Sequence, residues 1–158
     1  MMRDEGGSAA ITTVVLLPLL LTVVAGVVQL GAIRVVAARV SSAADLATLA
    51  AADDQDAGEL VRTGVLRLAP DAEAVARSYF ALNLAPLAPL LAVTPSEAAA
   101  QADVVAFAST PVTDPLTGWR YDRPTVRLAA SVPVRTPAFG ALFAPTTLVT
   151  VRAASAAR

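Results

Sequence analysis

The feature that most constrains this chain is a long apolar run near its N-terminus. Residues 6–33 contain no charged side chain. A helix needs about 20 apolar residues to cross the hydrocarbon core of a bilayer, and residues 9–33 supply that length. Pro18 would break a helix in water, but membrane helices tolerate proline because the freed carbonyl finds another partner. We therefore predict one transmembrane helix over residues 9–33, preceded by a short segment, residues 1–8.

Two alternatives to a retained anchor are less consistent with this length. A buried helix of a soluble domain is seldom this long and this apolar. A secretory signal peptide has an apolar region of about 7–15 residues, whereas the helical pattern of this chain continues past residue 33. Retention in the membrane is the prediction, and cleavage after the helix is the alternative.

The helical pattern extends beyond the anchor over residues 34–57. Apolar residues recur there at steps of three and four, as on one face of a helix, and alanine is the best helix former. We expect one rod of about 40 residues, or about 60 Å, ending at acidic residues 53–59 with Gly58 as the breaker. Six residues are predicted to pack against other helices: Gly26, Gly31, Val36, Val40, Ala44 and Ala47.

Composition lowers the expectation of catalysis. The chain has no His and no Cys, which removes the commonest general base, the commonest metal ligand and any thiolate chemistry. The formal net charge of -1 gives no sign of a nucleic-acid surface. The acidic residues near position 54 lack the glycine and closing glutamate of a calcium loop. We predict no catalytic residue, metal site, cofactor, small-molecule substrate or nucleic-acid partner.

The region from residue 58 to residue 158 is predicted to form a small α+β domain. Residues 70–84 have a helical pattern, and a second short helix over residues 94–102 begins with the capping-box pair Thr94 and Glu97. The apolar face predicted for the first of these helices contains Ala72, Val75, Tyr79 and Leu82.

Three strands are expected after these helices, at residues 104–109, 125–135 and 146–155. The middle segment alternates cleanly, which predicts one apolar and one polar face, and Pro133 suggests that its end lies at an edge. Residues 139–143 are expected to form an apolar corner. The fold class is therefore α+β: a long transmembrane helix that continues into an amphipathic helix, then two short helices under a roughly three-stranded antiparallel sheet.

One polar and aromatic cluster lies at the turn before the second strand. It contains Trp119, Arg120, Tyr121 and Arg123. The favoured interpretation is structural, with the tryptophan closing the hairpin onto the core and an arginine stacked on it. The alternative is an exposed patch for contact with a partner.

The N-terminal third resembles a known family. The matching motifs are Gly7-Ser8-Ala9, a Leu-Pro-Leu-Leu-Leu run at residues 17–21, Gln29-Leu30-Gly31 and the Ser-Ala-Ala-Asp segment at residues 42–52. They resemble the TadE/TadG family, pseudopilin-like minor proteins of the tight-adherence (Flp) pilus system. The resemblance implies a cytoplasmic N-terminus and an exported C-terminal domain in the cell's inner membrane. The positive-inside rule points weakly the other way, because Arg34 and Arg39 follow the span and only Arg3 precedes it.

The same resemblance raises the question of processing. Prepilin peptidase would cut after Gly6 or Gly7, and prepilins carry a glutamate at the fifth position after the cut. Here that position is Ile11 or Thr12, which favours retention in the membrane over entry into a fibre. We predict a non-enzymatic, minor pseudopilin-like or assembly component whose partners are membrane lipid and other pilus components. A generic membrane-tethered binding domain is the alternative, and a tethered enzyme using two carboxylates comes third.

Overall fold

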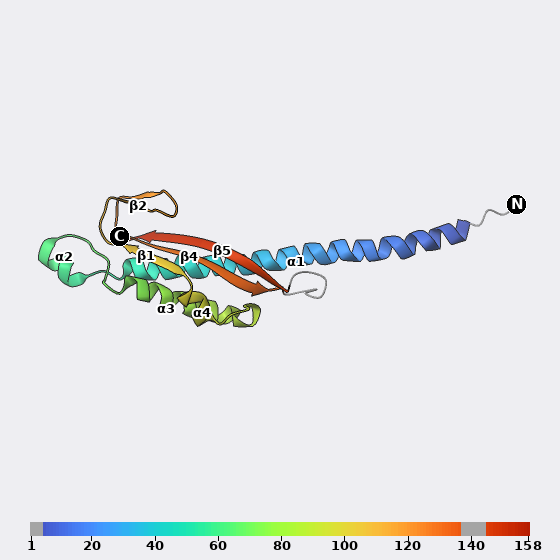
Figure 1. Cartoon of the computed structure of the whole chain (residues 1–158), viewed down its shortest axis with the longest axis horizontal. Helices are drawn as coiled ribbons and strands as arrows, with labels where there is room; N and C mark the ends of the chain where they lie inside the picture. Colours follow the sequence, from blue (N-terminus) through green and yellow to red (C-terminus); the bar gives the residue numbers. More distant parts are fainter. Residues whose placement is uncertain (1–4, 137–144) are drawn as a thin grey trace.

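The structure, a computed structural model, describes the backbone of residues 5–136 and 145–158, with side chains from residue 12 onward in those ranges. A single long helix, α1, spans Glu5–Asp53. Its N-terminal half projects away from the rest of the molecule, and its C-terminal half lies against a small domain made of all the later elements (Figure 1). The fold class predicted from the sequence is confirmed.

Helix α1 is longer than the rod of about 40 residues that the sequence predicts. Its 49 residues correspond to about 74 Å at the usual helical rise, because it begins at Glu5, ahead of the predicted span. Pro18 lies inside the helix without ending it. Near it, the Thr22 hydroxyl donates to the Pro18 carbonyl at 2.8 Å, the local bond by which threonine is accommodated in an apolar helix.

The break after α1 is not where the sequence suggests. Gly58 lies inside the next helix, α2 (Ala57–Thr63), and α1 ends at Asp53. The Asp56 side chain caps α2 by accepting from the Glu59 amide at 2.9 Å, which is the usual role of aspartate at this position. The left-handed residue that ends a helix is Gly64, with φ of 71°.

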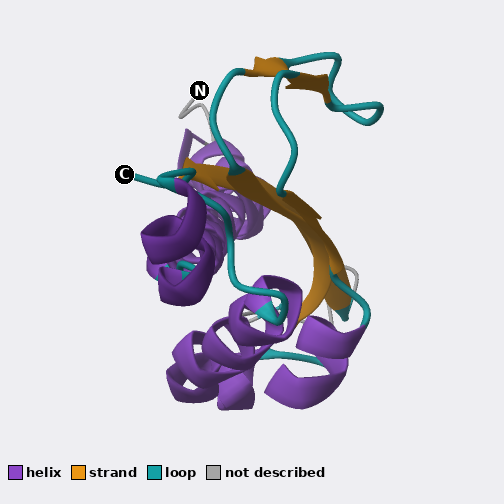
Figure 2. Cartoon of the chain, turned by 90° about the vertical axis from the view of Figure 1, so that its left-hand side faces the viewer, coloured by secondary structure: helices purple, strands orange, loops and turns teal. Residues whose placement is uncertain are grey.

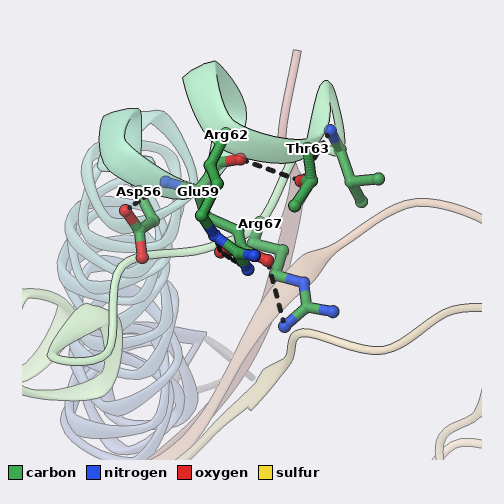
Figure 3. Close-up of polar contacts among 6 residues, drawn as sticks. Asp56, Glu59, Arg62, Thr63 and Arg67 are labelled. Atoms are coloured by element: carbon green, nitrogen blue, oxygen red, sulfur yellow. Dashed lines mark hydrogen bonds and ion pairs between the residues drawn. The ribbon is translucent and has the colours of Figure 1, made fainter.

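Two of the acidic residues around α2 take part in its cap and in ion pairs: Asp56 caps the helix, and Glu59 forms ion pairs. Glu59 pairs with Arg62 at 2.6 Å and with Arg67 at 3.8 Å (Figure 3). Among residues 12–136 and 145–158, no group of three or more acidic side chains is placed to hold a metal ion.

Helix α3 (Ala72–Leu84) uses a different face from the predicted one. Its buried residues are Ala72, Ala76, Phe80 and Leu84, whereas Tyr79 and Leu82 are 45% and 66% exposed. Both stripes start at Ala72 and repeat at three or four residues, so the apolar pattern alone does not separate them. The observed stripe places the full Phe80 ring in the core, and the small side chain of Ala76 allows a close approach to α1.

The chain then turns through two short helices. A 3-10 helix, η1 (Ala85–Leu90), follows α3, and α4 spans Pro95–Ala100. The predicted capping box of α4 is confirmed: the Glu97 amide donates to Thr94 Oγ1 at 3.2 Å and the Thr94 amide donates to Glu97 Oε2 at 2.8 Å.

The main sheet has three antiparallel strands in the order β1-β4-β5, over Asp103–Phe107, Thr125–Arg135 and Thr146–Ala156. A hairpin of two short strands, β2 (Val112–Thr113) and β3 (Arg120–Tyr121), stands on the face of the sheet turned away from the helices (Figure 2). The predicted alternation of β4 is confirmed, because its apolar residues are buried: Val126, Leu128, Ala130, Val132 and Val134.

Pro133 lies in the central strand, not at the edge that the sequence suggests. Strand β1 pairs with β4 only as far as Ala129, so a missing N–H at Pro133 leaves no ladder bond unmade. Its carbonyl still accepts from the Ala92 amide at 2.9 Å.

The long helix is itself a layer of the domain core. The sequence suggests that the sheet packs on the two short helices, but the C-terminal half of α1 runs beneath β5 and β4 and beside α3. Its buried residues there are mostly alanines, including Ala44, Ala47 and Ala51, whose small side chains let helix and sheet approach closely. Thr48 Oγ1 lies 3.0 Å from Ser155 Oγ of β5. The apolar corner predicted at residues 139–143 lies outside the described residues.

Candidate functional site

The first candidate surface is the projecting half of α1. Its large apolar side chains are exposed in the isolated chain, Leu20 for example by 60%. In residues 12–136 and 145–158, one helix is long and apolar enough to cross a membrane. Moving a leucine-sized side chain from water to an apolar medium is worth about 1.5–3 kcal/mol. Such a surface is unstable in water and suited to lipid, which points to a single-pass membrane anchor.

The predicted helix-packing residues divide between two environments. Val36, Val40, Ala44 and Ala47 are buried in the chain's own core, so they hold the domain onto α1 and are covered from other subunits. A methyl group added at Gly26 or Gly31 would meet no atom within 4 Å. These two glycines therefore leave room on the projecting half, and their use as a packing point for another helix stays a prediction.

The second candidate surface is the outer face of the sheet, where an arginine holds the hairpin. Arg127 of β4 is buried. Its Nε lies 3.3 Å from Oδ2 of Asp114 in the hairpin, and its Nη1 donates to Oδ2 of Asp103 in β1 at 3.0 Å. A guanidinium shared by two carboxylates ties the hairpin to two strands of the sheet, because removing either partner would leave buried charge poorly compensated.

The turn inside the hairpin is built on Asp114, which is fully buried. Its Oδ1 accepts from the Leu116 amide at 2.9 Å and its Oδ2 accepts from the Thr117 hydroxyl at 2.7 Å. Its carbonyl accepts from the amide of Gly118, whose φ is 73°. Burial by itself raises the pKa of Asp114, but these hydrogen bonds and the charge of Arg127 outweigh it and hold the pKa below the ordinary value of 3.8.

Acid should therefore loosen the hairpin. Because the folded-state pKa of Asp114 is lowered, its carboxylate stabilises the hairpin above the ordinary pKa and loses that effect as the pH falls through the folded value. Trp119 is the only tryptophan, so its fluorescence anisotropy reports on the hairpin. In the wild type we expect the anisotropy to decrease once the pH is lower than about 4. In Asp114→Asn we expect the anisotropy to be low already at pH 7. An unchanged anisotropy in that variant would contradict the anchoring role of the carboxylate.

The aromatic cluster on the hairpin is more exposed to solvent than the favoured sequence interpretation predicts. Trp119 is 70% exposed, so it does not close the hairpin onto the core. The Arg120 guanidinium pairs with Asp122 at 3.2 Å, and the ring of Tyr121 lies 5.4 Å from that of Phe107. The tryptophan stays exposed because the side chains of Asp114 and Arg127 occupy the space between the hairpin and the sheet.

Trp119 and Tyr121 form one wall of a groove of about 310 Å³ between the hairpin and strands β4 and β5. The other wall contains Arg127, Arg152 and Ala154. The groove thus combines aromatic surface with positive charge. The sequence identifies the tryptophan and tyrosine as candidates, but it does not single out Arg127 and Asp114, because an arginine on the polar side of an alternating strand and an aspartate before a proline both resemble ordinary surface residues.

Comparison with known proteins agrees with the N-terminal resemblance. Residues 7–54 match the family model described as Tad, putative Flp pilus-assembly TadE/G-like. The matched segment covers the projecting half of α1 and the half that enters the domain core. No curated protein matches, and no solved structure matches. The match supports a role in Flp pilus assembly, and the resemblance to the TadE/G-like family that the sequence predicts is confirmed over residues 7–54.

Proposed function

We propose that this protein is a non-enzymatic, minor pseudopilin-like or assembly component of a tight-adherence (Flp) pilus or related secretion system. The observation that carries the proposal is the family match at residues 7–54 on a helix that is apolar and exposed in one half and built into a domain in the other. Because the anchor and the core of the domain share one continuous helix, the depth of the anchor in the membrane also fixes the position of the domain relative to the membrane surface.

The proposed location is the cytoplasmic membrane, with the N-terminus inside and the domain outside. The family resemblance supports this orientation, although Arg34 and Arg39 after the span oppose it by charge count. Both arginines are exposed on α1, and an excess of two arginines over one is a small charge difference for setting the orientation.

Retention in the membrane is proposed over entry into a fibre. A prepilin glutamate buried in an apolar fibre is stabilised by pairing with the next subunit's N-terminus, and this chain has Ile11 or Thr12 at that position. Gly6 and Gly7 lie within α1. A peptidase would have to unwind the helix there, which two glycines make easier, and the mass of the mature N-terminus tests whether the chain is cut.

The domain is proposed to contact other pilus components through the hairpin cluster of Trp119, Arg120, Tyr121 and Arg123. Exposed tryptophan, tyrosine and arginine side chains are the types that dominate binding energy at protein interfaces. The groove lined by Trp119 and Tyr121 adds a concave surface next to this cluster. Membrane lipid around the projecting helix is the second proposed partner.

Deletion of the gene tests the proposed function. We expect surface Flp pili, counted by electron microscopy, to be lost or strongly reduced in the deletion strain. The full chain supplied in trans should restore them, a Trp119→Ala chain should restore them poorly, and a Val61→Ala chain, altered at an exposed position in α2 and outside the hairpin, should restore them fully. Normal pili in the deletion strain would contradict the proposal and favour a membrane-tethered binding domain unrelated to pili.

A further inference from the structure

The two edges of the main sheet differ. Strand β1 forms one edge, and α3 covers it: the Ala106 amide donates to Oε1 of Glu73 at 3.2 Å. Strand β5 forms the other edge and is 11 residues long. No described residue outside β4 donates to or accepts from the backbone of residues 146–156.

The register shows which backbone groups face this open edge. The outward Ala106 amide means that Ala106 and Val126 do not exchange ladder bonds, so Val126 bonds toward β5. Alternation along an antiparallel ladder then assigns the inward bonds of β5 to Val149, Val151 and Ala153. The N–H and C=O groups that point outward belong to Leu148, Thr150, Arg152 and Ala154.

The β5 edge has little of the usual protection. Natural proteins discourage pairing at an edge with charged side chains, above all lysine, with proline, with a bulge or with a very short strand. Residues 146–156 read Thr-Thr-Leu-Val-Thr-Val-Arg-Ala-Ala-Ser-Ala, with no proline, no lysine and Arg152 as the one charged side chain, and they pair with β4 in unbroken register. Threonine and valine favour strands. This edge is a template for one more strand.

We propose that the β5 edge binds an extended segment of a different protein chain, with an acidic side chain beside Arg152. Arg152 is exposed on the outer face and, among the described residues, no carboxylate pairs with it. Its neighbours along the outer face of β5 are Thr150 and the 68% exposed Leu148. An added antiparallel strand would therefore place an acidic, a β-branched and an apolar residue at alternate positions.

A second copy of this chain does not fit the edge, given the membrane anchor proposed above. Strand β5 runs along the axis of α1 (Figure 1), so antiparallel pairing of two β5 strands would point the two anchors in opposite directions. A copy in the same orientation would present its β1 edge, which Glu73 occupies. A copy turned about the membrane normal would bring the inner face of one sheet beside the outer face of the other.

Binding of a designed peptide to the full chain in detergent micelles tests the proposal. The probe is a fluorescein-labelled peptide, Ser-Thr-Glu-Thr-Val-Thr-Leu-Thr-Ser, whose glutamate, valine and leucine face the outer side in the antiparallel register. We expect saturable binding by fluorescence anisotropy, with empty micelles as the blank. Thr150→Pro removes one outward donor but no bond to β4, and should weaken binding at least about tenfold. The matched control Thr150→Ala keeps the donor and should bind within about threefold.

Two further comparisons do not depend on how the proline variant folds. A peptide N-methylated at the amides that face β5 should not bind the unaltered protein. Arg152→Glu should weaken binding of the glutamate peptide about tenfold, and a peptide with arginine in place of glutamate should recover it. No saturable binding, equal binding of the methylated peptide, or binding unaffected by Thr150→Pro would overturn the proposal. The assay contains no pilus, so its failure is distinct from failure of the proposed function.

Discussion

Phe80→Ala should lower the free energy of unfolding of the domain by about 3–5 kcal/mol, the usual cost of deleting a buried aromatic ring. Phe80 is fully buried and belongs to the core cluster that joins α3 to α1 and the sheet. The same core cluster contains small side chains on helices, such as Ala44 and Ala76, which cannot extend to fill the space left by the ring. A cavity would remain, and most of the cost would be retained.

Leu82→Ala is the matched control, since it removes a large apolar side chain from the same helix at a 66% exposed position. Its expected cost is under about 1 kcal/mol. The measurement is hydrogen exchange of the β4 amides, with the full chain in detergent, because exchange there reports opening of the domain while the anchor stays helical. A larger effect of Leu82→Ala than of Phe80→Ala would contradict the observed packing face and favour the one suggested by sequence.

Some features of the fold could be predicted because they are local. The anchor depends only on the length of an uncharged run, the start of α4 on a capping pair three residues apart, and β4 on apolar residues at every second position from Val126 to Val134. Each of these patterns is contained in one short stretch of the sequence and needs no information about distant parts of the chain.

Other features depend on tertiary contacts. Two apolar stripes of α3 that start at Ala72 fit the helical period equally well. The buried stripe is therefore determined by packing against α1, which the sequence of α3 does not show. The sequence suggests that Gly58 breaks the helical pattern, whereas the Asp56 cap and the left-handed Gly64 show that Gly58 lies inside α2. Trp119 is exposed because Asp114 and Arg127, thirteen residues apart in sequence, occupy the position beneath the hairpin.

The sequence does not reveal that α1 is both the anchor and a layer of the domain core. Val36, Val40, Ala44 and Ala47 had the spacing of a packing face, and the pattern could not distinguish a partner helix from the chain's own domain. The structure fills that face from within. The surfaces proposed here for partners are the projecting half of α1, the hairpin cluster and the edge of β5.

Single cysteines give the second large prediction, because the natural chain contains none and each introduced thiol is a unique probe. Leu20 lies in the middle of the projecting half of α1, and Val61 is 88% exposed in α2 at the far end of the domain. Leu20→Cys should be shielded by lipid, where a thiol cannot ionise to the reactive thiolate. Val61→Cys should be fully accessible to water on the outer side of the membrane.

The central claim, that one helix anchors the chain and holds the domain outside the cell's inner membrane, is tested by labelling both variants in intact spheroplasts with a membrane-impermeant maleimide. We predict complete labelling of Val61→Cys, and labelling of Leu20→Cys only after the membrane is dissolved in detergent. Rapid labelling of Leu20→Cys in intact membranes would contradict the anchor. Labelling of Val61→Cys only after lysis would place the domain in the cytoplasm and contradict the orientation.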